Sequence, residues 1–305
     1  NLNKAHTIML VQEGIIDRES AKKILLGLDD MRKSFKLEDL DPKQEELYFC
    51  FEQNLLDRIG REAGGKMHTG RSRNDIWACM TRMITRKSIW DVLEEVLKTQ
   101  DLLLKTCYEN LDTLITGYTH MQPAQPTTLA HYFSAYINVL TRDFARIRLA
   151  YEFTNECPLG GAAFAGTGFP INRQTVSDLL GFDRILTNTI DCVGTRDYLL
   201  QTEMAYASMM TELSRVAHDM YIWTTDEFGI WEVGNEIAIT SSIMPQKKNP
   251  ISFEHMMGRA ASAIGSVVTT SAVLKNETFN FTCDLFEVAN YYEQARKHTM
   301  QCLGL

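Results

Sequence analysis

The sequence predicts an all-α fold built from long helices, and two observations carry that prediction. Residues that break helices are scarce, since the 305-residue chain holds only 18 glycines and 7 prolines. No proline falls within residues 43–122 or 171–244, so long uninterrupted helices are permitted there. No run of alternating apolar residues is long enough to predict a sheet.

Apolar residues repeat at helical spacing in three stretches of the chain. Residues 89–111 carry a stripe with one polar interruption, Gln100, and its spacing close to seven predicts a long helix packed nearly parallel to others. Residues 129–147 and 200–221 carry the second and third stripes. Small residues are frequent in the stretch 252–274 and permit close approach of helices, or of subunits.

Length, charge and cysteine usage limit the class of protein. At about 150 residues per domain, the length predicts two domains. A formal net charge of −8 argues against a nucleic-acid-binding surface, although a small basic pocket for an anion stays possible. Seven cysteines without a C-x-x-C pair indicate reduced thiols in a cytoplasmic protein rather than disulfides or zinc. No apolar run approaches the ~20 residues that span a membrane.

Three polar segments bearing glycine or proline lie between the predicted helices, at residues 64–75, 117–128 and 240–250. Loops on a rigid scaffold are the usual place for chemistry. A fourth segment, 158–170 (PLGGAAFAGTGFP), is glycine-rich and apolar, which predicts a tight crossing of backbones.

The first polar segment gathers cationic side chains in an otherwise acidic chain. They are Lys66, His68, Arg71 and Arg73. With Ser72 and Asn74 as neutral donors, the cluster suits a carboxylate or phosphate, and a solvated basic loop is the alternative. Residues 60–67 (GREAGGKM), which overlap this segment, nearly match the G-x-x-x-x-G-K-[ST] pattern of a nucleotide-binding loop. However, Met67 replaces the magnesium-binding hydroxyl and residues 51–59 predict a helix rather than a strand, so we reject a nucleotide site.

The second and third segments offer candidate catalytic groups. His120 stands before two prolines that favour an extended path, and it could act as a general acid or base, although a lone loop histidine is more often structural. The third segment, TSSIMPQKKNP, holds Ser241, Ser242, Lys247 and Asn249. Pro250 suits the first turn of a following helix, whose N-terminal amides favour an anion, and Glu254 lies one turn further on.

Together, HTGRSRND, GYTHMQPAQPTT and SSIMPQKKNP resemble the three signature loops of the argininosuccinate lyase branch of the fumarase/aspartase superfamily. The resemblance implies a long central helical bundle at residues 76–305, a small N-terminal helical domain at 1–75 whose start is missing, and an absent C-terminal domain. It also implies a homotetramer in which three subunits contribute to each active site. The implied reaction is anti-elimination of an amine from an N-substituted aspartate to give fumarate, without metal or organic cofactor.

The resemblance assigns roles residue by residue. Ser241 matches the proposed catalytic base, with Lys247 and loop amides lowering its pKa. His120 matches the group that protonates the departing nitrogen, and Glu254 the carboxylate that orients it. The small dicarboxylate-bearing substrate would be held by residues at the matching positions: Ser72, Arg73, Asn74, Thr119, Gln122, Ser242, Lys247 and Asn249.

The chain departs from the family where the arginine half of the substrate would bind. The family carries Tyr, Gln and Lys there, and an ungapped count places Phe281, Phe286 and Ala289 at those positions. Each hydrogen bond lost to a charged group costs about 1.5–3 kcal/mol. We therefore favour another N-substituted aspartate, such as an aminopolycarboxylate or an iminodisuccinate-like compound, with argininosuccinate itself as the alternative.

Two other classes of protein are remote alternatives. A non-catalytic, crystallin-like structural protein belongs to the same superfamily, but the joint presence of Ser241, His120, Lys247 and Glu254 argues against it. Binding of nucleic acid is disfavoured by the net charge.

Overall fold

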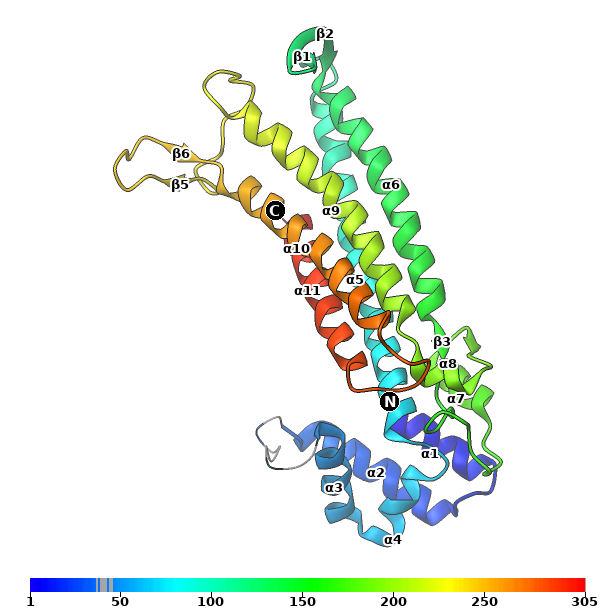
Figure 1. The fold of residues 1–305 in the computed structure, drawn as a ribbon. Helices are drawn as coiled ribbons and strands as arrows, with labels where there is room; N and C mark the ends of the chain where they lie inside the picture. The colour runs from blue at the N-terminus through cyan, green and yellow to red at the C-terminus, as the bar shows by residue number, and fades with distance from the viewer. Residues whose placement is uncertain (37, 39–42, 44–45, 305) are drawn as a thin grey trace. The chain divides into compact units, whose positions relative to one another are not determined.

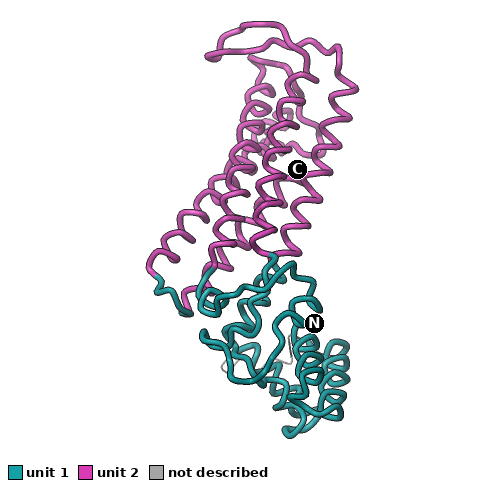
Figure 2. Tube along the Cα trace, turned by 90° about the vertical axis from the view of Figure 1, so that its right-hand side faces the viewer, with its two compact units in different colours: residues 1–84, 155–195, 277–282 teal, residues 85–154, 196–276, 283–305 magenta. Residues whose placement is uncertain are grey.

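The computed structural model describes residues 1–36, 38, 43 and 46–304, and these residues form two compact units (Figures 1 and 2). The first unit comprises residues 1–84, 155–195 and 277–282, and the second comprises residues 85–154, 196–276 and 283–305. Each unit is thus assembled from three separate segments of chain. The all-α fold that the sequence predicts is confirmed.

The first unit is a set of short helices around an apolar core. Its elements are α1 (Leu2–Gln12), α2 (Arg18–Ser34), α3 (Leu47–Ile59), α4 (Arg61–Gly64), the 3₁₀ helix η2 (Gly65–His68), the start of α5 (Arg73–Glu109), α7 (Arg173–Leu180) and α8 (Thr189–Gly194). Side-chain caps define several helix starts, as where Asp17 accepts the N–H of Ser20 at 2.8 Å. Met9, Leu10 and Ile24 are fully buried in this core.

The second unit is a bundle of long helices (Figure 1). It contains the rest of α5 with α6 (Leu129–Thr154), α9 (Asp197–Trp223), α10 (Ile251–Leu274) and α11 (Leu285–Leu303). The three predicted stripes lie on α5, α6 and α9, and their members Val96, Leu140 and Met210 are fully buried. No described helix is both long and apolar enough to cross a membrane.

The described residues also form three two-stranded sheets that alternation in the sequence did not predict. One is an antiparallel hairpin, β1 (Leu114–Thr119) with β2 (Gln122–Thr128). The others are the parallel pair β3 (Glu156–Cys157) with β4 (Arg184–Ile185), and the antiparallel pair β5 (Ile239–Thr240) with β6 (Lys248–Asn249). Each is too short or too exposed to show a clear apolar period.

Candidate active site

The first polar segment is largely helical rather than a loop. Ser72 caps α5, since its Oγ accepts the N–H of Asn74 at 3.3 Å. Asp75 reaches back and accepts the N–H of Ser72 at 3.0 Å, which completes a reciprocal capping box. Ser72, Arg73 and Asn74 therefore stand at the positive end of a 37-residue helix. The S-x-x-D spacing of Ser72 and Asp75 explains why α5 starts at Arg73, within the segment that was expected to be a loop.

Arg73 and Asn74, both predicted to bind substrate, have identifiable partners. Arg73 Nη1 lies 3.0 Å from Glu46 Oε1. Asn74 Nδ2 donates to the carbonyl of Ala163 at 3.2 Å. Both side chains are half-buried to exposed, so each stays accessible to a ligand within this unit.

The other cations of the segment do not form a common anion cradle. Lys66 pairs with Asp17 at 2.7 Å. His68 Nδ1 lies 2.9 Å from Glu52. Arg71 is buried, and one of its amino groups donates to the hydroxyl of Tyr48 at 3.1 Å. Together with the pairing of Arg73 with Glu46, nearby acidic and hydroxyl groups thus engage all four predicted cations. These partners come from the starts of α2 and α3 and from within α3, where the sequence pattern could not place them.

His120 lies at the tip of the β1–β2 hairpin in a strained backbone conformation. His120 and Met121 are the two central residues of the turn and have φ values of 54° and 59°. Both central residues of such a turn need positive φ, which glycine and asparagine adopt most easily. Strain of this kind typically costs about 1–3 kcal/mol per residue and concentrates at functional sites. The candidate acid is therefore presented on an exposed turn whose two central residues have left-handed backbone conformations.

Thr119 and Gln122 flank that turn as a cross-strand pair. Thr116 pairs with Pro126 and Tyr118 with Pro123, so the register shifts between these pairs, where two residues of β2 form a bulge opposite Gly117. The ring of Tyr118 lies 5.3 Å from that of Phe228, which anchors the hairpin to the segment after α9.

Ser241 lies directly after β5, in the chain between α9 and α10. Its Oγ accepts the N–H groups of Ile243 at 3.3 Å and Met244 at 3.2 Å. Two amide donors aimed at one hydroxyl oxygen favour negative charge on that oxygen. Lys248 forms an ion pair with Glu232, whereas Lys247, the predicted partner of Ser241, is exposed.

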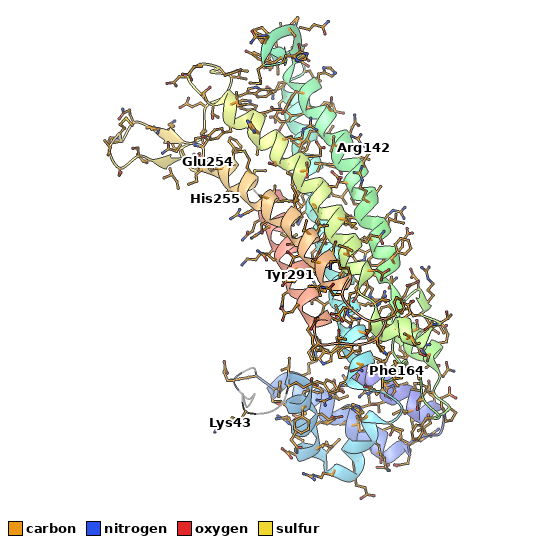
Figure 3. All side chains as sticks on the ribbon, viewed as in Figure 1. Lys43, Arg142, Phe164, Glu254, His255 and Tyr291 are labelled. Carbon is orange, nitrogen blue, oxygen red and sulfur yellow. The ribbon has the colours of Figure 1, made fainter. Side chains whose placement is uncertain are left out.

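Glu254 and the adjacent His255 lie in the first turns of α10 and are exposed (Figure 3). The helix starts at Ile251, and Pro250 is its N-cap residue. The proline thus precedes the first turn, in which the sequence had placed it. The hairpin with His120 and the segment with Ser241, Ser242, Lys247 and Asn249 lie at the same end of the bundle, where α5 and α9 end and α6 and α10 begin (Figure 1). Within the described part of the chain, no hydrogen bond or ion pair joins the two groups.

The three predicted specificity residues have different environments. Phe281 packs against Leu186, Cys192 and Val193 in the first unit. Phe286 is 36% exposed at the start of α11, and Ala289 is half-buried one turn further on.

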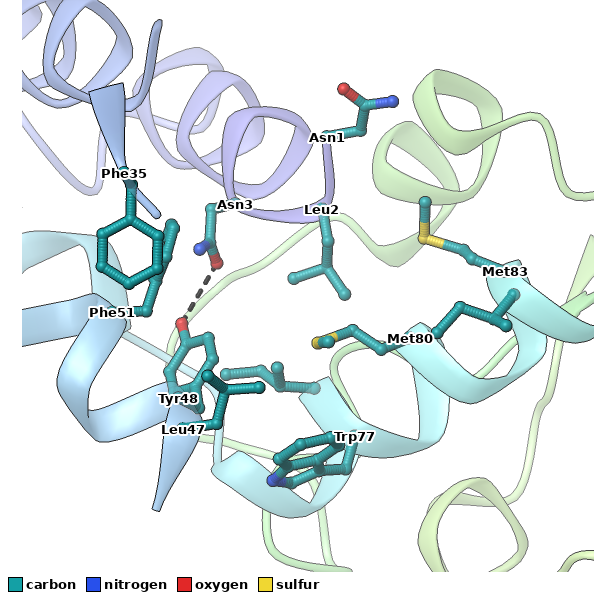
Figure 4. Close-up of a pocket in the computed structure, with 12 residues that line it drawn as sticks. Asn1, Leu2, Asn3, Phe35, Leu47, Tyr48, Phe51, Trp77, Met80 and Met83 are labelled. Atoms are coloured by element: carbon teal, nitrogen blue, oxygen red, sulfur yellow. Dashed lines mark hydrogen bonds between the residues drawn. The ribbon is translucent and has the colours of Figure 1, made fainter. Parts of the chain in front are cut away.

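A cavity of about 410 Å³ in the first unit has an almost wholly apolar lining that includes Leu2, Tyr48, Trp77 and Met80 (Figure 4). Its few polar groups include Asn3, which accepts the hydroxyl of Tyr48 at 3.1 Å. None of the predicted site residues lines it. It lacks the cationic groups that a dicarboxylate requires.

Two carboxylates that contact the substrate-binding candidates, Asp75 and Glu46, were not predicted from the sequence. The signal for Asp75 was the capping-box spacing after Ser72. Nothing in the sequence pointed to Glu46, because its contact with Arg73 arises from the packing of separate helices.

The chain belongs to the lyase family, whose sequence model matches residues 3–265. Its membership of the argininosuccinate lyase branch of the fumarase/aspartase superfamily, which the three loops predicted, is confirmed.

Curated relatives carry the name argininosuccinate lyase. That of Methanosarcina barkeri is 44% identical over 283 residues, covering 93% of this chain and 57% of the relative. Argininosuccinate lyase 1 of Shouchella clausii is 42% identical over 306 residues, covering 100% of this chain and 61% of the relative. The chain thus spans about three fifths of the length of these relatives.

Solved structures share the fold. A variant of EDDS lyase with bound fumarate superposes with a TM-score of 0.89 and 34% identity, over 99% of this chain and 60% of that one. Class II fumarase from Schistosoma mansoni, at 18% identity and a TM-score of 0.81 over 99% of this chain and 71% of that one, supports the fold alone.

Proposed function

We propose that this chain forms part of a carbon–nitrogen lyase that eliminates an amine from an N-substituted aspartate and releases fumarate. The observation that carries the proposal is the pair of N–H groups, from Ile243 and Met244, aimed at Ser241 Oγ. A serine serves as a base only where its alkoxide is stabilised, and fixed amide donors supply such stabilisation. The names of the curated relatives and of EDDS lyase support the same reaction class.

In the proposed mechanism, Ser241 removes a proton from the carbon beside a carboxylate, and Lys247 stabilises the charge on both groups. The carbanion places a second negative charge on that carboxylate, so the site needs concentrated donors. His120, oriented by Glu254 of a neighbouring subunit, protonates the departing nitrogen. Ser72 Oγ already accepts the N–H of Asn74, so its own proton is free to donate to a substrate carboxylate.

The remaining donors would hold the two carboxylates of the aspartate half. They are Arg73, Asn74, Thr119, Gln122, Ser242 and Asn249. Arg73 would exchange Glu46 for a carboxylate of the substrate, a change of partner that keeps the guanidinium paired in both states.

A homotetramer is part of the proposal. Apolar side chains line one exposed face along α5 and just beyond its end. They are Trp90, Leu97, Leu104, Tyr108 and Leu111. Their spacing near seven matches a helix packed lengthwise against another, and exposed stripes of this kind mark interaction surfaces. Assembly would bury this stripe and bring the His120 hairpin to the Ser241 segment of another subunit. The free thiols, of which only Cys283 is exposed, suit a cytoplasmic enzyme.

Argininosuccinate is the first candidate substrate, because the curated relatives that match this chain at 39–44% identity carry that name. A different N-substituted aspartate, such as an aminopolycarboxylate, is the second. Phe281, Phe286 and Ala289 favour it, since they cannot hydrogen-bond a guanidinium.

A panel of N-substituted aspartates decides between the two substrates. The full-length enzyme is incubated with argininosuccinate, with an ethylenediamine-linked disuccinate and with iminodisuccinate, and fumarate is followed by its ultraviolet absorbance. Preferential turnover of argininosuccinate supports the first candidate, and preferential turnover of either aminopolycarboxylate supports the second. Absence of fumarate with all substrates would contradict the proposed reaction.

A further inference from the structure

Asp75 is a fully buried carboxylate that accepts three backbone N–H groups. Its Oδ1 accepts from Ser72 at 3.0 Å, and its Oδ2 accepts from Gly160 at 2.8 Å and from Ala162 at 3.0 Å. The bonds to Oδ2 cross 85 and 87 residues of sequence. One side chain therefore joins the start of α5 to the glycine-rich segment 158–170.

Helix capping alone does not account for this arrangement. A capping box needs a single acceptor at the third helical position, and Oδ1 fills that role with Ser72. Burial raises the pKa of Asp75, and the N–H groups of Ser72, Gly160 and Ala162 oppose that rise. A residue needed only as a cap could remain in solvent and avoid this desolvation.

The glycine-rich segment is shaped to present its amides to the carboxylate. Gly160 has a φ of 91° and Ala162 a φ of 52°, and these left-handed conformations turn both N–H groups to one side of the chain. A side chain at residue 160 is excluded, because a Cβ atom there would lie 2.7 Å from Cγ of Arg173. Arg173 braces the other side of the segment, donating to the carbonyls of Leu159 at 3.0 Å and Leu186 at 2.7 Å.

The braced segment in turn contacts a candidate substrate-binding residue. The carbonyl of Ala163 accepts from Asn74 Nδ2 at 3.2 Å. This bond fixes the orientation of the Asn74 carboxamide. The second N–H and the Oδ1 atom stay available to bind a ligand. Ser72 and Asn74 are thus both held by the same structure, one through Asp75 and the other through the segment that Asp75 fastens.

We propose that Asp75 is a positioning residue that fastens the glycine-rich segment 158–170 to the start of α5 and so holds Ser72 and Asn74 in place for the substrate carboxylates. This inference rests on the proposed function. Loss of the acceptor leaves two buried N–H groups without a partner and frees the segment to move, which misplaces the Asn74 carboxamide.

The test compares Asp75→Asn with Asp17→Asn in the full-length enzyme. Asp17 caps α2 in the same unit through the N–H of Ser20, so its variant also loses a helix-capping carboxylate. Asp17 pairs with Lys66, but among the described residues it makes no hydrogen bond or ion pair with Ser72, Asn74 or the segment 158–170. Three readouts are taken: hydrogen–deuterium exchange of residues 158–166, KM with kcat for the preferred substrate, and the inhibition constant of fumarate.

We expect both variants to unfold at lower temperature, but only Asp75→Asn to lose exchange protection at 158–166. It should also raise KM and the fumarate inhibition constant by about tenfold or more, with a smaller change in kcat. Wild-type protection and constants in Asp75→Asn, or equal changes in Asp17→Asn, would overturn the proposal. If Asp75→Asn does not fold, Asp75→Glu replaces it, because glutamate keeps the charge and the cap but displaces the second oxygen.

The exchange measurement does not depend on catalysis. A wild-type enzyme that releases no fumarate from any substrate defeats the proposed function, whereas unchanged exchange in Asp75→Asn defeats the fastening of the two segments.

Discussion

Thr270 of α10 donates a hydrogen bond to Glu203 of α9, with 3.0 Å between Thr270 Oγ1 and Glu203 Oε1, in the interior of the helical bundle. Both side chains are fully buried. The second oxygen, Oε2, has no hydrogen-bond partner among the described residues. Burial raises the pKa of Glu203 from 4.5 to about 8, so the carboxyl is largely protonated at neutral pH.

This buried acid predicts that the stability of the fold decreases as pH rises. Below pH 4.5 the carboxyl is protonated in both states, and between 4.5 and about 8 only the unfolded chain ionises it, which favours unfolding. Glu203→Gln should remove this dependence, on the order of 4 kcal/mol across the window. Denaturant unfolding of both proteins at pH 5 and pH 8 measures it. Glu94→Gln, on the exposed face of α5, is the control, and an unchanged pH dependence in Glu203→Gln would contradict the expectation.

The turn that carries His120 should be stabilised by glycine at its second central position. Met121 has a φ of 59° and is 59% exposed, so Met121→Gly relieves strain without removing a core contact. We expect a gain of about 1 kcal/mol in the free energy of unfolding. The same substitution at Met204, which is 49% exposed within α9, should destabilise by a similar amount because glycine is unfavourable in a helix. A loss of stability in Met121→Gly would show that the turn is not strained.

The proposed sharing of active sites between subunits predicts complementation. Chains with Ser241→Ala and chains with His120→Asn should each be inactive, and mixing them under conditions that exchange subunits should restore a measurable fraction of activity. The reason is that some sites then receive an intact Ser241 and an intact His120 from different chains. A mixture of His120→Asn with Gln122→Ala is the control, since both changes lie on one hairpin. Full activity from a dilute monomer would contradict a shared site.

The substrate preference should respond to the residues of α11. Phe286→Gln combined with Ala289→Lys restores donor and acceptor groups that the family carries, and should raise kcat/KM for argininosuccinate by at least tenfold if the wild type prefers another amine. Phe153→Gln, an exposed phenylalanine of α6, controls for loss of apolar surface. An unchanged ratio between argininosuccinate and the aminopolycarboxylates would show that these positions do not select the amine.

The sequence predicted features that depend on local spacing. The stripes at 89–111, 129–147 and 200–221 predicted the long helices. A helix that buries one face needs apolar residues at a 3.6-residue period, whichever elements cover that face. The β1–β2 hairpin was not predicted, since its exposed strands carry no apolar alternation and two prolines interrupt β2.

Contacts between distant segments could not be predicted. The hydrogen bonds from Gly160 and Ala162 to Asp75 depend on how two distant segments pack in the first unit. A single sequence does not reveal such packing. For the same reason, the pairing of Lys66 with Asp17 and of Arg73 with Glu46 was missed. The candidate site could be predicted because its residues lie within three short segments that resemble the signature loops of the family.

The most direct test of the proposed chemistry is the rate of fumarate release by the full-length enzyme and by Ser241→Ala with the preferred substrate. We predict that the wild type releases fumarate and that the variant is slower by about 10²–10⁴-fold, the usual contribution of a general base. Retention of the fold in the variant is checked by its unfolding temperature. Equal rates in the two proteins would contradict the assignment of Ser241 as the base, and no fumarate from either would contradict the proposed reaction itself.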